Sequence, residues 1–331
     1  MPTPTSPPTA TRWVYNYKMC AFMGTVHILA VAALPFVFWA EWRTNIFALA
    51  YYIFSAAGIT AGSHRLWSHR SYEAKLPVRI LLACAASAAN QGSIFHWARD
   101  HRVHHKFSET PADPHNAKRG LFFAHIGWLL VQKDAKVIEA GKKLDLSDLE
   151  ADPVVMFQRR FATLCAIVWC FVVPTLVPAL CWGESWLNAY MVPGVLRYVC
   201  LLHATWLVNS VAHTHGTRPY APEQNPSESP LVALLAIGEG WHNWHHAFPY
   251  DYAASELGMF HQFNPTKLFI DACCLLGLAG NRKRATTAWG ARLGRMRRQA
   301  SEQDKEIQPS LCGPPMFRRR TIAKMARTQR N

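Results

Sequence analysis

The segment from Gly238 to Tyr252, GEGWHNWHHAFPYDY, carries histidines at positions i, i+3 and i+4. On a helix such residues lie on one face, so three imidazoles would point the same way. The segment RDHRVHHKF repeats this HxxHH pattern, and HRLWSH adds a third cluster. The clustered histidines are His64, His69, His101, His104, His105, His242, His245 and His246. Because imidazole is the commonest metal ligand among side chains, these clusters indicate a metal site rather than unrelated core or surface histidines.

The ligand type limits the metal. A closed zinc site would use thiolates, yet no cysteine lies in these clusters, and the nine cysteines form no CxxC pair. Most cysteines lie in apolar runs, which favours reduced thiols over a disulfide framework. Eight or nine imidazoles are too many for one ion, so the sequence predicts two metals. Two irons with open positions could bind O₂ and remove hydrogen from an unactivated C–H bond, which no side chain can do alone.

Apolar and polar blocks alternate along the chain. Half of the residues are hydrophobic, yet the mean hydropathy is only −0.03. Four apolar runs approach the roughly 20 residues that a helix needs to cross a membrane. They cover about 17–40, 45–62, 161–181 and 186–207. Short turns join the first two and the last two, so we expect an all-α integral membrane protein with four transmembrane helices in two hairpins.

The remaining segments complete the expected organisation. Residues 1–16 begin with a Pro/Thr-rich stretch and should form a disordered tail without a cleavable signal. The membrane domain should cover 17–283, with a helical His-rich cap formed by 63–160 and 208–283. If the histidine clusters share one centre they lie on one side of the membrane, so the apolar run from Ile80 to Phe95 should lie along the membrane or within the cap. Residues 284–331 form a basic tail.

Charge predicts the orientation. The two connecting turns contain a single Lys or Arg, Arg43, whereas nearly all other cations lie on the side of the clusters. The positive-inside rule then makes the cap and both termini cytosolic. Residues 281–331 carry 14 Lys or Arg against three acids. We expect this tail to face anionic membrane lipid and not nucleic acid, because no nucleic-acid-binding motif accompanies it.

The histidine clusters and the text around them resemble a known family. HRLWSH, ARDHRVHHKFSE with ADPHN, and NSVAH followed by GEGWHNWHH are similar to the three histidine boxes of the membrane-bound acyl-CoA desaturases, the stearoyl-CoA desaturase family. The likeness extends from about Tyr51 to Lys283 and includes LDLSDLEAD, MFQRR and TLVP. The resemblance implies a di-iron centre in the cap.

The resemblance also assigns ligands. It implies one iron held by His64, His69, His101, His105 and His245, and another held by His104, His213, His242 and His246, with Asn209 reaching the second iron through a water. His213 is the ligand that spacing alone does not select. The other seven histidines are interpreted as structural: His27, His96, His115, His125, His203, His215 and His261. Asp100 and Glu239 flank box residues and are candidates to accept hydrogen bonds from ligand imidazoles.

Substrate residues follow from the same resemblance. It implies that the anionic headgroup of an acyl-CoA meets Asn16, Arg99, Asp100, Lys133 and Trp206. Gln91, Trp97 and Thr205 would shape a kink in the acyl tunnel, and Tyr52 would close its far end. Two positions depart from the family pattern, with Gly92 in place of Asn and Gln132 in place of Arg. These departures should weaken headgroup binding more than they affect the chemistry.

The expected activity is insertion of a cis double bond, at Δ9 by resemblance, into a saturated fatty acyl-CoA. O₂ takes up four electrons, two from the substrate and two from a donor. The chain has neither an HPGG haem-binding motif nor a dinucleotide fingerprint, so the donor should be a separate protein. The resemblance implies cytochrome b5, reduced by a NADH-dependent reductase, at the endoplasmic reticulum membrane.

Two alternatives stay open from the sequence. A fatty-acid or alkane hydroxylase would use the same di-iron oxidant and histidine boxes. A non-catalytic metal-binding membrane protein or metal transporter would predict ionisable residues within the spans. Toward the middle of the predicted spans there is little beyond His27, Arg197 and His203, and Lys18 lies at the start of the first span.

Overall fold

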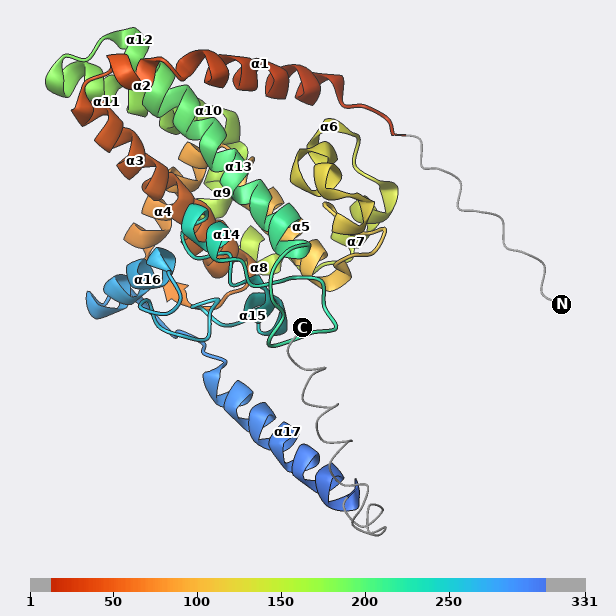
Figure 1. The fold of residues 1–331 in the computed structure, drawn as a ribbon. Helices are drawn as coiled ribbons and strands as arrows, with labels where there is room; N and C mark the ends of the chain where they lie inside the picture. Colours follow the sequence, from red (N-terminus) through yellow and green to blue (C-terminus); the bar gives the residue numbers. More distant parts are fainter. Residues whose placement is uncertain (1–12, 308–331) are drawn as a thin grey trace, which may run out of the picture. The chain divides into compact units, whose positions relative to one another are not determined.

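The computed structural model describes residues 13–307, with side chains described to residue 299. The regular secondary structure of the described chain is helical apart from one two-stranded ribbon (Figure 1). The described residues divide into two compact units, one that ends at Arg284 and one that begins at Ala285. The second unit contains one described element, the basic helix α17 (Thr286–Ile307). The expectation of a disordered tail lies partly outside the described residues, whereas residues 14 and 16 hydrogen-bond with Gln132 and Leu130.

The first unit begins with apolar helices and continues into short helices of the polar part. Its elements in chain order are α1 (Tyr17–Ala33), α2 (Phe36–Trp39), α3 (Trp42–Ala57), η1 (Gly58–Ser68), β1 (Glu73–Ala74), α4 (Leu76–Ala89), α5 (Ile94–Phe107), η2 (Ala117–Arg119), η3 (Phe123–Gly127), α6 (Trp128–Leu130), α7 (Ala135–Lys142), α8 (Ser147–Glu150), α9 (Pro153–Arg160), α10 (Ala162–Ala166), η4 (Ile167–Val172), α11 (Val173–Trp182), α12 (Trp186–Ala189), η5 (Tyr190–Leu196), α13 (Arg197–Ser210), η6 (Val211–His213), α14 (Pro230–Leu235), α15 (His242–Ala247), α16 (Pro265–Leu275) and β2 (Ala279–Gly280).

Three continuous helical stretches are long and apolar enough to cross a membrane, 42–68, 162–182 and 186–213. A fourth crossing is possible if α4 and α5, which meet at a bend of 82°, count as one broken span. These findings support a helical membrane protein. The stretches 42–68 and 186–213 extend beyond the ends expected near residues 62 and 207. His64 and His213 therefore lie on direct continuations of apolar helices.

The first predicted span differs from the expectation. The apolar helix α1 ends at Ala33, and the short helix α2 follows after Pro35. Proline lacks an N–H and its ring clashes with the preceding turn, which explains the break. From this break α1 and α3 splay apart, so they do not lie side by side as a hairpin (Figure 1). Instead, Met23 and Val26 of α1 pack in one cluster with Tyr198 and Leu202 of α13.

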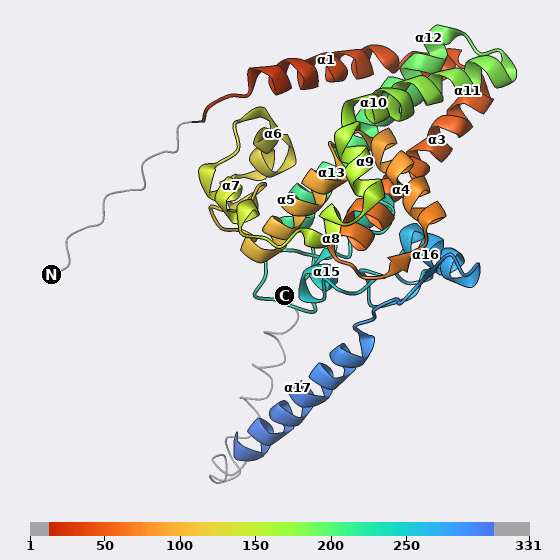
Figure 2. The ribbon, with the colours of Figure 1, turned by 180° about the vertical axis from the view of Figure 1, so that it is seen from behind.

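Small residues allow close packing near the boxes. Gly58 of η1 lies against the backbone of Ala85 and Ala86 in α4, where a Cβ on Gly58 would be only 2.1 Å from the nitrogen of Ala86. On its other side α4 packs with α9 and α10 (Figure 2). Small residues permit such close approach between apolar helices. The contact holds the first histidine box firmly against the rest of the unit.

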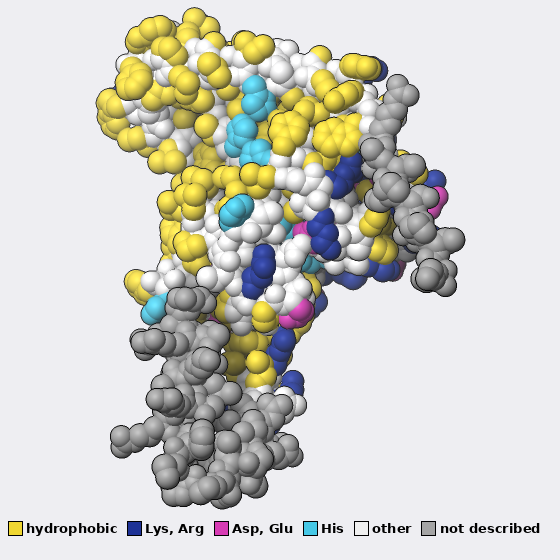
Figure 3. Space-filling model, turned by 45° about the vertical axis from the view of Figure 1, so that its right-hand side comes forward, with side chains coloured by type: hydrophobic (Ala, Val, Ile, Leu, Met, Phe, Trp, Pro, Cys, Tyr) yellow, Lys and Arg dark blue, Asp and Glu magenta, His cyan; other side chains and the backbone are white. Residues whose placement is uncertain are grey.

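The polar part has its own core. Trp67, Leu82, Leu149 and Ile270 are buried in one cluster that joins η1, α4, α8 and α16. The antiparallel pair β1–β2 joins Glu73 to Gly280 and so ties the end of the unit to the first box. Hydrophobic side chains dominate one end of the face in Figure 3, whereas Lys, Arg, Asp and Glu lie toward the other.

Candidate metal centre

A change of helix type brings the first box together. The helix α3 continues into η1, a π-helix in which backbone hydrogen bonds join residues five apart. The N–H of His69 donates to the carbonyl of His64 at 3.1 Å, and their ring centroids lie 4.9 Å apart. On a regular α-helix, residues five apart point about 140° away from each other. The wider turn therefore places both imidazoles on the same side.

The other boxes lie on short helices that face η1. The helix α5 presents His101, His104 and His105, and α15 presents His242, His245 and His246, each set at helical spacing. Arg102 of α5 donates to the carbonyls of Trp67 and Ser68, which docks α5 against the end of η1. The last ligand candidate, His213, ends η6 directly after α13.

The structure gathers these nine histidines into two groups. Within each group, one ligand nitrogen per residue lies within 4.8 Å of the others; the groups are His64, His69, His101, His105 and His245, and His104, His213, His242 and His246. In the first group the Nε2 atoms of His64 and His245 are 3.0 Å apart. In the second, the Nε2 atoms of His213 and His242 are also 3.0 Å apart. The membership equals the two ligand sets that the resemblance assigns, and iron binding stays a prediction.

Several of the converging ring nitrogens are available to a metal ion. The Nδ1–H groups of His64, His104 and His213 donate to carboxylates, so their Nε2 atoms carry lone pairs. The Nε2 atom of His104 is buried and has no hydrogen-bond partner. Adjacent ligands of an ion with bonds of about 2.1 Å are about 3.0 Å apart in octahedral geometry. The donor set therefore fits a metal ion in each group.

Burial favours the neutral, metal-binding form of the imidazoles. Desolvation lowers the pKa of His69, His242, His245 and His246 well below the ordinary value, and neighbouring histidines lower it further. A neutral imidazole has one lone pair for a metal. At neutral pH these side chains are therefore ready ligands.

Carboxylates fix the direction of the ligand rings. Glu239 accepts from His64 Nδ1 at 2.8 Å and from Arg65 at 2.7 Å, as expected for an acceptor that orients an imidazole. Asp100, the other candidate, pairs instead with Arg99 and Lys133. Within the described part of the chain, its ion pairs are with a cation of α5 and a cation of the segment before α7, and not with a ligand imidazole.

Two orienting carboxylates were missed from the sequence. Asp113 accepts from His104 Nδ1 at 2.9 Å, and Glu109 accepts from His213 Nδ1 at 3.0 Å. Both follow the second box within a few residues, in FSETPADPHN, which is the signal that could have indicated them. His115 joins His104 and Asp113 in a third candidate metal group. Asp113 already accepts from Nδ1 of His104 and from the backbone N–H of His115. We therefore interpret this group as residues that orient His104 for the second metal site, and not as a third site.

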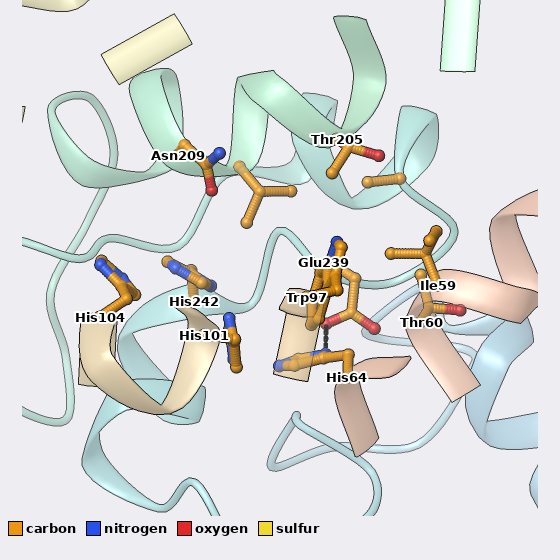
Figure 4. A pocket seen from close by; sticks show the side chains of 12 residues that line it. Ile59, Thr60, His64, Trp97, His101, His104, Thr205, Asn209, Glu239 and His242 are labelled. Carbon is orange, nitrogen blue, oxygen red and sulfur yellow. Dashed lines mark ion pairs between the residues drawn. The ribbon is translucent and has the colours of Figure 1, made fainter. Parts of the chain in front are cut away.

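A pocket adjoins the two groups. Its wall includes His64, His101, His104 and His242, and on the other side Ile59, Thr60 and Thr205 (Figure 4). Asn209 of α13 lines the same pocket beside His104 and His242, where the resemblance places a water-mediated contact. The pocket adjoins a larger cleft, since Trp97, His101, Thr205 and Asn209 line both.

Most of the expected substrate residues share that cleft. It is lined by Asn16, Gln91, Trp97, Asp100, Lys133, Thr205 and Trp206, and by the departing position Gly92. The three kink residues are hydrogen-bonded in a row, with Trp97 Nε1 donating to Gln91 at 3.2 Å and Gln91 Nε2 donating to Thr205 at 2.8 Å. Arg99 lines a neighbouring pocket together with Asp100 and Lys133.

Tyr52 lies at a different place from these residues. It is not part of the cleft lining, but it packs in one hydrophobic cluster with Ile59, Leu201 and Trp97. Its hydroxyl donates to the carbonyl of Leu235 at 2.7 Å. Tyr51 points elsewhere, since its hydroxyl donates to the backbone carbonyl of Trp169 at 2.6 Å. Its role as the end of a tunnel stays a prediction.

Apolar helices that end in two convergent sets of imidazoles define a class, the histidine-box membrane proteins with a candidate two-site metal centre. A sequence model of the fatty acid desaturase family matches residues 40–265, which include all three boxes. The chain belongs to the fatty acid desaturase family.

Named relatives agree with this assignment. Stearoyl-CoA desaturase 5 of Bos taurus is 58% identical over 264 residues, which cover 80% of this chain and 78% of the relative. Stearoyl-CoA desaturase 5 of Homo sapiens is 56% identical over 82% of this chain and 81% of its own length. An acyl-CoA desaturase of Cyprinus carpio is 54% identical over 85% of this chain and 84% of its own length. The chain is therefore similar to these enzymes over most of its length.

Proposed function

We propose that this protein is a di-iron acyl-CoA desaturase that inserts a cis double bond into a saturated fatty acyl chain. The observation that supports it most is the pair of all-imidazole groups beside a cleft whose walls are mainly apolar. The names of the relatives, stearoyl-CoA and acyl-CoA desaturases, support the substrate class and make Δ9 the expected position.

The residues of the chain have distinct roles in this proposal. Glu239, Asp113 and Glu109 hold the proton on Nδ1 of three ligand rings, so that each Nε2 faces the metal position. When bound, the two irons supply the redox chemistry with O₂ that side chains lack. The hydrogen-bonded row from Trp97 to Thr205 fixes the wall along which the acyl chain bends. Burial excludes bulk water from the reacting position.

The headgroup site is expected at the polar mouth of the cleft. Lys133 and Arg99 both pair with Asp100, which leaves a net positive charge beside Asn16 for an anionic headgroup. Gly92 has open space around its Cα and adds no side-chain contact. We therefore expect weaker headgroup binding than a chain with Asn there would have, with little effect on the chemistry.

The electron donor and the membrane setting are also proposed. We infer that cytochrome b5 and a NADH-dependent reductase deliver the two external electrons at the endoplasmic reticulum, with the histidine-rich cap and both termini in the cytosol. The short apolar helix α1 would serve as the fourth span. A tag after Asn331 should be accessible when only the plasma membrane is permeabilised; a lumenal tag would contradict this orientation.

Lipid analysis tests the activity. Expression in desaturase-deficient cells should restore monounsaturated acyl chains, detected with double-bond position by mass spectrometry. His104→Ala and His245→Ala should each abolish the product while the protein still inserts into the membrane, because the apolar helices are unchanged. His261→Gln, which changes an exposed histidine, is the control. Hydroxylated acyl chains in place of unsaturated ones would identify a hydroxylase instead.

Chain length gives a finer test. The packing of Tyr52 near Trp97 supports a position along the acyl path, so Tyr52→Ala should increase turnover of longer acyl-CoAs relative to shorter ones without moving the double bond. Tyr51→Ala should lack this effect, because the Tyr51 hydroxyl donates a hydrogen bond to the carbonyl of Trp169 and so lies elsewhere. Competition among C14 to C20 acyl-CoAs measures the profile. An unchanged profile for Tyr52→Ala, or equal shifts in both variants, would remove Tyr52 from the tunnel end.

A further inference from the structure

Three histidines outside the metal centre form a continuous chain between apolar helices. His27 of α1 and His203 of α13 meet through their Nε2 atoms at 3.2 Å. The Nδ1 atom of His203 meets His125 Nε2 at 3.0 Å, and His125 Nδ1 meets the Ser210 hydroxyl at 2.9 Å. All three histidines are half-buried, and Figure 3 shows histidine side chains in a row among hydrophobic ones.

The partners at the two ends of this row of histidines fix how many protons the three rings hold. His27 Nδ1 lies 2.6 Å from the carbonyl of Met23, which can only accept, so His27 must donate there. The Ser210 hydroxyl donates to the carbonyl of Trp206 at 2.8 Å, so His125 Nδ1 must donate to Ser210. Each of the two contacts between rings needs one hydrogen as well. Four hydrogens on three rings is one more than neutral imidazoles carry, so the complete set of contacts contains one imidazolium.

Three neutral imidazoles can also satisfy every contact in the row, but only after the Ser210 hydroxyl rotates. If Ser210 turns its hydroxyl to His125 Nδ1, each ring carries one hydrogen and every contact between rings still has a donor and an acceptor. Ser210 then no longer donates to the carbonyl of Trp206. The uptake of one proton is thereby coupled to a hydrogen bond at Trp206.

The three rings also surround the indole of Trp206. His27 lies parallel to it at 6.1 Å between centroids, while His203 and His125 meet it edge-on at 5.2 Å and 5.7 Å. Trp206 lines the substrate cleft. A cation beside an aromatic ring is attracted to it, more strongly where water is excluded. A proton on this chain would therefore act on the cleft wall.

The neighbouring elements bring no counter-charge to the chain. Among the described residues, no Asp or Glu pairs with the three histidines. Lys18 lies near the start of α1, and Arg197 of α13 donates to the carbonyls of Pro193 and Cys170. The elements η3 and α6 contribute no other titratable side chain at this contact. An ionisable cluster that joins apolar helices without such a partner points to a function.

We propose that His27, His203 and His125 form a proton-binding site behind Trp206, and that the bound proton strengthens the binding of an anionic acyl-CoA in the cleft. The inference rests on the proposed function and adds three positioning residues to it. Burial lowers the pKa of His125, so the site takes up its proton below about pH 6.5, the ordinary value for histidine.

Binding without turnover tests the proposal. The dissociation constant of stearoyl-CoA is measured on the full-length, iron-loaded protein in detergent under anaerobic conditions, between pH 6 and pH 8. The ratio of wild-type to variant affinity removes the titration of the ligand itself. Relative to His203→Gln, the wild type should gain about two- to fivefold in affinity at pH 6, as one added positive charge near an anionic ligand provides in a largely solvated site, and little at pH 8.

Two further variants keep the test decisive. His27→Gln interrupts the hydrogen-bonded histidines from α1 instead of α13. It should lose the same gain in affinity at pH 6, and it serves in place of His203→Gln if that variant folds poorly. His261→Gln, at an exposed histidine, should follow the wild type. Equal pH profiles for the wild type and both chain variants would overturn the proton-binding site while leaving the proposed function intact. Absence of stearoyl-CoA binding at every pH would overturn the proposed function as well.

Discussion

Glu239 joins two parts of the candidate centre that are far apart in the sequence. It follows Gly238, whose φ of 111° lies in a region that other residues rarely adopt. One carboxylate oxygen accepts from His64, and the other accepts from Arg65. Arg65 also donates to the carbonyl of Tyr252, beyond the third box. A single buried carboxylate thus holds the first box in register with the third.

Glu239→Gln should therefore weaken metal binding more than it weakens folding. The neutral amide cannot accept from both His64 and Arg65 with the strength of a carboxylate, so the His64 ring loses its fixed direction. Loss of such a partner typically reduces metal affinity or activity about 10- to 100-fold. Iron content after dialysis against a chelator, measured together with turnover, checks this.

The matched control is Glu139→Gln, which makes the same change at an exposed position of α7. It should keep wild-type iron content and turnover. Full iron retention by Glu239→Gln under the same dialysis would contradict the role given to this carboxylate.

Some residues of the candidate site could be predicted from the sequence, and others could not. The HxxHH segments were predictable because an α-helix places such residues on one face. His213 was found only through the resemblance, because it stands alone in NSVAH and reaches the site by the end of α13. Glu109 and Asp113 were missed because the turn that aims them at His213 and His104 depends on tertiary contacts.

At the scale of helices, the contact between η1 and α4 depends on one glycine. A Cβ on Gly58 would lie 2.1 Å from Ala86 N and 2.2 Å from Ala85 C, both of them backbone atoms that cannot move aside separately. Gly58→Ala should therefore push α4 away from the helix that carries His64. Overpacking of this kind costs about 1–3 kcal/mol or more. Thermal unfolding in detergent, with turnover of the folded fraction, measures the loss.

Gly24→Ala supplies the control within another apolar helix. A Cβ on Gly24 meets nothing within 4 Å, so the substitution should leave stability unchanged or raise it by up to about 1 kcal/mol through helix propensity. Equal stability of both variants would show that the η1–α4 contact is less tight than described.

The helices also show where sequence reasoning stopped short. The apolar runs indicated spanning helices at three of four places, because length and composition suffice for that inference. The first run is covered by two helices, α1 and α2, which are separated at Pro35 because proline breaks a helix. The π-helical form of η1 could not be predicted, because it arises where the chain packs against α4 and α5 and not from any local preference.

For the molecule as a whole, the buried histidines link stability to pH. Burial lowers the pKa of His242 and His246 in the folded protein, whereas an unfolded chain binds these protons near pH 6.5. Below about that pH the unfolded state binds more protons, so the stability that is fully present above it is lost as pH falls. Protons also compete with the metal for the same nitrogens.

We therefore expect the melting temperature and the iron content of the purified protein to fall together between pH 7 and pH 5.5. Thermal unfolding and metal analysis across this range measure both. The double variant His242→Gln/His246→Gln, measured without iron beside the iron-free wild type, should show a shallower dependence of melting temperature on pH. Stability that rises on acidification would contradict this linkage.

The distribution of the ligands along the chain also sets the order of events during synthesis on the ribosome. Four members of the first group have emerged by residue 105, but the fifth, His245, comes 140 residues later. The second group likewise waits for His242 and His246. Neither group is complete until nearly three quarters of the polypeptide has been made. A nascent chain that stops before the third box would thus carry apolar helices in the membrane and loose histidines, with no complete site for iron.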